Sequence, residues 1–139
     1  MKARAKIKKH VEELKDLKAV LAYNMADSVY SNLLELLRDK QNTSITEKRI
    51  IELSISAIGG YSEYFTIAKS ESVKNNLKTA ITKLIDYAYK ALPKEGKIKL
   101  DNIDYEGFLN IQKKLTNAGD VAAQQKIAII FSKIDFTIN

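Results

Sequence analysis

The sequence predicts an all-α fold, a single-domain bundle of four to five helices, and two observations predict it. One proline and five glycines in 139 residues leave few points at which a helix must end. Between those points, apolar residues recur every three or four positions, the spacing that places side chains on one face of a helix. No linker or repeat divides the chain, so we treat residues 1–139 as one domain with residues 1–10 as a basic tip or arm.

The first helix is predicted over about residues 2–40, which is unusually long. At 1.5 Å per residue it would measure about 58 Å, more than a compact domain of this size. It should therefore break near Tyr23 and Asn24, or project beyond the bundle with its first turns. We expect one apolar face along its whole length, made of Ile7, Val11, Leu14, Leu17, Leu21, Met25, Val29, Leu33, Leu36 and Leu37.

A second helix is predicted to begin at Ser44, because Ser44-Ile45-Thr46-Glu47 has the form of a capping box. Gly59 and Gly60 lie inside it, where each glycine weakens a helix by about 1 kcal/mol relative to alanine. We interpret this pair as a kink or a close helix crossing, and a hinge or a backbone contact to a ligand is the alternative. Tyr61 and Tyr64 follow directly, and their rings suit the edge of a core or, alternatively, stacking on nucleic-acid bases.

The third helix ends before Pro93 and has the clearest pattern. Its apolar face consists of Val73, Leu77, Ala80, Ile81, Leu84, Ile85, Ala88 and Leu92. A fourth helix is expected over about residues 102–117 and a fifth over 121–133. The fifth is apolar around most of its circumference, which predicts the most buried position in the bundle. Residues 97–100 and 134–138 alternate in polarity, so they are candidates for a minimal two-stranded ribbon.

Several kinds of chemistry are excluded by residue type. The chain has no cysteine, so no disulfide, thiolate nucleophile or cysteine-ligated metal site can form. His10 is the single histidine, and a di-metal helical bundle needs two. No phosphate-binding glycine motif and no GxSxG nucleophile motif occurs. We therefore predict a protein that is not an enzyme and needs neither a metal nor a cofactor.

The positive charge is concentrated at one end of the chain. The net charge is +6, and residues 1–10 contain five cations and no acidic residue. Cations at the start of a helix are unfavourable, because that end carries the positive pole of the helix dipole. The cations of residues 1–10 therefore do not stabilise their own helix, which indicates another role for them. Contact with nucleic-acid phosphates requires only lysine or arginine side chains that can reach them. A solubilising tail is the alternative, and an anionic membrane surface is a weaker one.

The candidate nucleic-acid-binding residues form two groups. The first group is the basic tip, namely Lys2, Arg4, Lys6, Lys8 and Lys9. The second group could extend the same track if the fold brings it near, and it consists of Lys94, Lys97, Lys99, Lys113 and Lys114.

Two functions follow as hypotheses. The first is a non-enzymatic helical subunit that contacts nucleic-acid phosphates independently of sequence, within a larger nucleoprotein assembly. The second is a helical adaptor or self-assembling protein–protein interaction module, because the apolar positions of the long first helix exceed what a small bundle can cover. No run approaches the roughly 18 apolar residues of a membrane span, so we expect no membrane partner and a cytoplasmic location.

Overall fold

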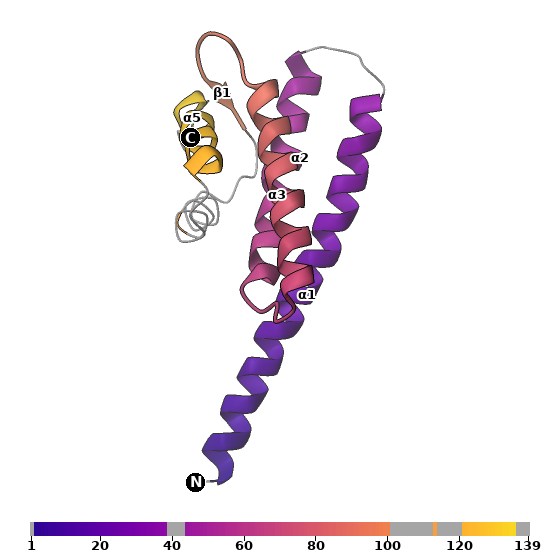
Figure 1. Cartoon of the computed structure of the whole chain (residues 1–139), viewed down its shortest axis with the longest axis vertical. Helices are drawn as coiled ribbons and strands as arrows, with labels where there is room; N and C mark the ends of the chain where they lie inside the picture. Colours follow the sequence, from indigo (N-terminus) through magenta and orange to yellow (C-terminus); the bar gives the residue numbers. More distant parts are fainter. Residues whose placement is uncertain (1, 39–43, 101–112, 114–120, 136–139) are drawn as a thin grey trace.

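The computed structural model describes residues 2–38, 44–100, 113 and 121–135, and in this part the chain forms a helical bundle (Figure 1). The side chains of residues 2–8, 10, 11, 44 and 45 lie outside the description. The elements are α1 (Lys2–Arg38), α2 (Ser44–Phe65), α3 (Glu71–Ala91), β1 (Ile98–Lys99), α5 (Val121–Lys133) and β2 (Ile134–Asp135). The predicted all-α fold is confirmed. The fourth helix expected over residues 102–117 falls outside the described residues, apart from Lys113.

The helices pack in chain order, α1 on α2, α2 on α3 and α3 on α5 (Figure 1). α1 runs without a break through Tyr23 and Asn24, and its N-terminal turns project beyond the other helices. Residues 12–18 are all exposed, and Ala19 is the first described residue of α1 that is buried. Of the two predicted outcomes for the long first helix, the structure therefore shows projection.

The core lies between successive helices, from the contact of α1 with α2 to the contact of α3 with α5. Its largest fully buried apolar side chains are Leu33, Ile51, Ile58, Leu84, Ile85, Ile127 and Ile130. The predicted inner face of α3 is confirmed, since Leu77, Ile81 and Ala88 are buried as well. At the start of this helix the Ser70 hydroxyl accepts a hydrogen bond from the Val73 N–H at 3.4 Å, which satisfies one of the free backbone donors of the first turn.

The glycine pair of α2 lies at a close helix crossing. A Cβ atom on Gly60 would stand 2.8 Å from the Cβ of Ala26, whereas one on Gly59 would meet nothing within 4 Å. The interpretation of this pair as a close crossing is therefore confirmed for Gly60. Two small residues facing each other let the backbones of α1 and α2 approach more closely than larger side chains would permit.

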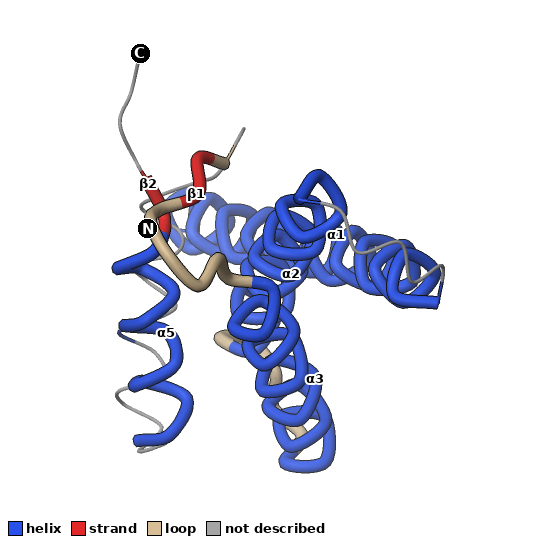
Figure 2. The backbone as a smooth tube through the Cα atoms, turned by 90° about the horizontal axis from the view of Figure 1, so that it is seen from above, coloured by secondary structure: helices blue, strands red, loops and turns tan. Residues whose placement is uncertain are grey.

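The two-stranded ribbon predicted from residues 97–100 and 134–138 is also present (Figure 2). Ile98 pairs with Ile134 and Lys99 with Asp135, and the strands are parallel. Parallel strands need a long crossover connection, which the chain between them supplies and which includes α5. The ribbon thus holds the end of α5 beside the segment that follows α3.

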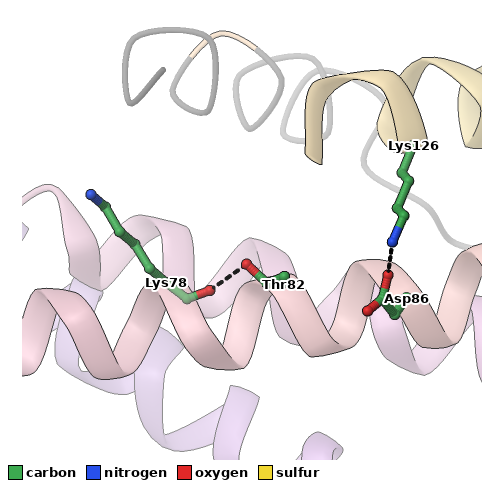
Figure 3. Close-up of polar contacts among 4 residues, drawn as sticks. All are labelled: Lys78, Thr82, Asp86 and Lys126. Atoms are coloured by element: carbon green, nitrogen blue, oxygen red, sulfur yellow. Dashed lines mark hydrogen bonds and ion pairs between the residues drawn. The ribbon is translucent and has the colours of Figure 1, made fainter. Parts of the chain in front are cut away.

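The expectation that the fifth helix is the most buried element is wrong. α5 packs on α3 through one face, formed by Ala123, Ile127 and Ile130, while Val121 and Ile129 are exposed. Among the described helices, α3 is the one that packs closely on α5, so apolar residues on the other sides of α5 stay exposed. The contact is completed by a part-buried ion pair between Lys126 of α5 and Asp86 of α3 (Figure 3).

Candidate protein interaction surface

The face of α1 that packs on α2 is built from small and aromatic residues. Ala19, Ala26 and Leu33 are buried and recur every seven residues, so they line one side of the helix. Tyr23 and Tyr30 lie beside them, half-buried. Because these residues fill the contact with α2, the side of α1 that faces away from them has no neighbouring element among the described residues.

Leu14, Leu17, Leu21 and Met25 form a row on that outer side, which we call the α1 strip. Their exposed fractions are 56%, 54%, 56% and 68%, respectively. At about 100° per residue they fall within an arc of about 80°, centred about 135° away from the buried face. The α1 strip is thus continuous and points to solvent.

This arrangement corrects the prediction of one apolar face along the first helix. The predicted face is right for Leu33, which is buried, and for Val29, Leu36 and Leu37, which pack against the core, but it is wrong for the four residues of the α1 strip. The physical reason is the crossing at Gly60, which accepts Ala22 and Ala26 of α1 and leaves no room for a leucine there. The large side chains that dominate the periodicity consequently lie outside.

A polar contact anchors the middle of α1 to α2. The Tyr61 hydroxyl donates a hydrogen bond to Asp27 Oδ1 at 2.5 Å, although 34 positions separate the two residues. Burial raises the pKa of the Tyr61 phenol above its usual value of 10.0, and the hydrogen bond to Asp27 raises it further. Both effects keep the hydroxyl protonated to a higher pH than in a solvent-exposed tyrosine.

Aromatic rings extend this anchor. The ring centroids of Tyr23 and Tyr61 are 5.5 Å apart in an edge-on arrangement, and those of Tyr23 and Tyr64 are 4.9 Å apart. Such pairs add stabilisation beyond the area that they bury. Tyr61 is buried, so its ring is packed at the core edge and does not present a face for base stacking.

An ion pair lies where the projecting part of α1 leaves α2. Lys18 Nζ is 3.7 Å from Glu63 Oε1, and the lysine side chain is otherwise exposed. An exposed pair of this kind contributes little to stability. The pair does place an acidic group next to the positive charge of Lys18, which borders the α1 strip. The α1 strip itself contains only apolar side chains.

The two groups of candidate phosphate-binding residues lie far apart. The basic tip belongs to the free end of α1, where the Lys9 side chain is exposed; the side chains of Lys2, Arg4, Lys6 and Lys8 are not described. Figure 1 places this end and β1 at opposite ends of the molecule. Lys94, Lys97 and Lys99 are exposed near β1, so they do not continue the track of the tip.

The remaining two candidates are Lys113 and Lys114. Lys113 is exposed, and Lys114 lies outside the described residues. Near β1, the ammonium group of Lys133 donates a hydrogen bond to the Lys94 carbonyl oxygen at 3.3 Å, so a further cation joins that end of the molecule.

In the described part of the chain, no group of three or more histidine, aspartate or glutamate side chains is placed to hold a metal ion. No helix of residues 2–38, 44–100 or 121–135 combines the length and apolarity needed to cross a membrane. The α1 strip is therefore the candidate functional site in the described residues.

Comparison with protein-family models, curated proteins and solved structures finds no match for this chain. Its function must accordingly be inferred from its own residues.

Proposed function

We propose that this chain is a non-enzymatic protein–protein interaction module that docks a helical partner along the α1 strip. The observation that carries the proposal is the row of four large apolar side chains, each more than half exposed. Single exposed apolar residues are common on soluble proteins, but a contiguous row of them marks an interaction site.

The spacing of the α1 strip suits a helix as the partner. Steps of three, four and four residues place the side chains along one side of α1. Helices that recognise other helices present anchors at this spacing, and the partner's side chains fill the spaces between them. Burial of these side chains would drive the association.

The way in which α1 is held also supports docking. Tyr61 and Gly60 fix its middle against α2, and the helix continues unbroken into the projecting turns. The α1 strip is therefore presented on a preformed helix, so little conformational entropy is lost when a partner binds.

Site-specific photocrosslinking in the native cell tests the proposal. A photoreactive phenylalanine analogue would replace Met25 in one variant and Asn76, an exposed residue of α3, in a control variant. We expect a covalent protein adduct from position 25 and none from position 76. Absence of any adduct from position 25, or equal adducts from both positions, would contradict the proposal.

Contact with nucleic-acid phosphates is the second candidate function. The five cations of residues 1–10 belong to the free end of a projecting helix, away from the rest of the described fold. Sequence-independent binding of this kind weakens steeply as salt rises. We expect a nonspecific oligonucleotide to bind in low salt and to lose affinity when residues 2–10 are deleted.

The matched control for that experiment removes the cations at the opposite end of the molecule. Replacing Lys94, Lys97 and Lys99 with glutamine changes the same kind of charge near β1. We expect the triple variant to bind like the unmodified chain. A deletion of residues 2–10 that leaves affinity unchanged would remove this second function.

A further inference from the structure

Building on the proposed docking function, we infer that the partner covering the α1 strip is a second copy of this chain, with the two α1 helices antiparallel. A dimer with two-fold symmetry needs only one self-complementary surface, and such dimers are the commonest oligomers. Three features of α1 favour this partner.

The first feature is the symmetry of the α1 strip. Leu14 and Met25 lie nearly equal distances from a point next to residue 19, and so do Leu17 and Leu21. A two-fold axis through that point sets Leu14 of one copy against Met25 of the other, and Leu17 against Leu21. Each apolar side chain then meets another apolar side chain.

The second feature is the position of that point within the helix. α1 runs over Lys2–Arg38, so its midpoint is close to the centre of the α1 strip. Two antiparallel copies of α1 would overlap along nearly their whole length, about 50 Å. The outer side of α1 lies away from α2, and Figure 1 shows the N-terminal turns clear of the other labelled helices. The second copy can therefore approach without displacing the bundle.

The third feature is charge, which selects the antiparallel orientation. A parallel pair would place the five cations of residues 1–10 of both copies side by side. An antiparallel pair separates these two groups by about 40 Å, several times the screening length of about 10 Å in 0.1 M salt.

The antiparallel pair also places each basic tip beside the C-terminal end of the other copy's α1. That end carries the negative pole of the helix dipole, while the exposed Glu35 and Arg38 balance each other. The same cations that oppose the dipole of their own helix would thus be stabilised by the dipole of the partner's helix.

Analytical ultracentrifugation of the full chain tests the inference. We expect a species of twice the 15.7 kDa chain mass at micromolar concentration. Replacing Leu17 and Leu21 with lysine should weaken dimerisation at least 100-fold, and Met25→Lys should weaken it independently. Because all three side chains are more than half exposed, circular dichroism should show unchanged helicity.

A matched control separates the α1 strip from general surface hydrophobicity. Val121 and Ile129 are exposed apolar residues of α5, with exposed fractions of 62% and 41%. The double variant Val121→Lys/Ile129→Lys should dimerise like the unmodified chain. Loss of the dimer in this control, with the α1 variants still dimeric, would overturn the inference.

The orientation can be measured because the chain contains no cysteine of its own. A spin label on Ser31→Cys, an exposed position of α1 that follows the α1 strip, gives one label per copy. Antiparallel helices centred at residue 19 separate the labels by about 35 Å along the axis. Parallel helices would leave them about 10 Å apart, the distance between packed helix axes, and that result would overturn the inference.

The outcomes also separate this inference from the proposed function. The chain could stay monomeric at high concentration while position 25 crosslinks to a different protein in the cell. That result would overturn the inference that the partner is a second copy, but it would support the proposed docking function. A monomer that gives no adduct at position 25 overturns both.

Discussion

A Cβ atom on Gly60 would lie 2.4 Å from the carbonyl oxygen of Ala22, closer than side-chain carbons approach backbone oxygens in proteins. The backbones of α1 and α2 are therefore in contact at this point, and any larger residue would force them apart. Gly59, the neighbour of Gly60 in the same helix, has open space where its side chain would be. The two glycines consequently give a matched pair of substitutions.

Gly60→Ala should lower the free energy of unfolding by about 1–3 kcal/mol, the usual cost of overfilling a packed contact. Gly59→Ala should raise the free energy of unfolding by up to about 1 kcal/mol, because alanine is the better helix former. Urea denaturation followed by circular dichroism measures both. If both variants were stabilised, the close crossing of α1 and α2 would not exist.

The hydrogen bond between Tyr61 and Asp27 predicts a pH dependence. Burial and this bond raise the pKa of Tyr61 above 10.0, so the folded chain keeps the phenolic proton after the unfolded chain has lost it. The free energy of unfolding should therefore be unaffected by this group below about pH 10 and fall as the pH rises above it.

Tyr61→Phe removes the titrating phenol. The free energy of unfolding of this variant should therefore fall less steeply between pH 10 and pH 11 than that of the unmodified chain. Some slope should remain, because the pKa values of Tyr23 and Tyr30 are also raised by burial. Chemical denaturation at a series of pH values gives both curves. Parallel curves for the variant and the unmodified chain would refute the assignment.

The contrast between α3 and α1 shows how far the sequence could predict the fold. On α3 the buried positions, such as Leu84 and Ile85, are large and apolar, so periodicity identified them directly. On α1 the buried positions include Ala19 and Ala26, which contribute little to a hydrophobic pattern. Their burial depends on a glycine more than 30 positions away, and no local pattern contains that information.

The candidate surface was predictable only in part, for the same reason. Periodicity predicts that Leu14, Leu17, Leu21 and Met25 lie on one side of a helix, but it does not say whether that side meets the core or solvent. The excess length of the first helix was the signal that its apolar residues could not all be covered. The cations of residues 1–10 were found from composition, whereas their separation from Lys94, Lys97 and Lys99 required the fold.

Ser54 offers a prediction about the interior of α2. Its side chain is fully buried, and its Oγ has no hydrogen-bond partner in the described part of the chain. A buried hydroxyl without a partner has lost its bonds to water and gained none in exchange. Ser54→Ala should therefore raise the free energy of unfolding by about 1 kcal/mol, as measured by urea denaturation. A loss of stability in this variant would show that the hydroxyl is bonded in solution.

Two leucines of α1 test whether one side of this helix is buried against α2 and the other is exposed to solvent. Leu33 is fully buried, whereas Leu21 of the α1 strip is 56% exposed. Leu33→Ala should lower the free energy of unfolding by about 2–5 kcal/mol, because it removes core contacts and leaves a cavity. Leu21→Ala should change the free energy of unfolding by no more than about 0.5 kcal/mol.

That comparison must be made under conditions in which the chain is monomeric, since association through the α1 strip would add to the apparent stability. Thermal unfolding at several protein concentrations provides the check. At the lowest concentration the two variants should differ as stated. As concentration rises, the melting temperature of the unmodified chain and of Leu33→Ala should increase, while that of Leu21→Ala should increase less. Equal destabilisation by both substitutions at low concentration would mean that the α1 strip is buried within the single chain and is not a surface for a partner.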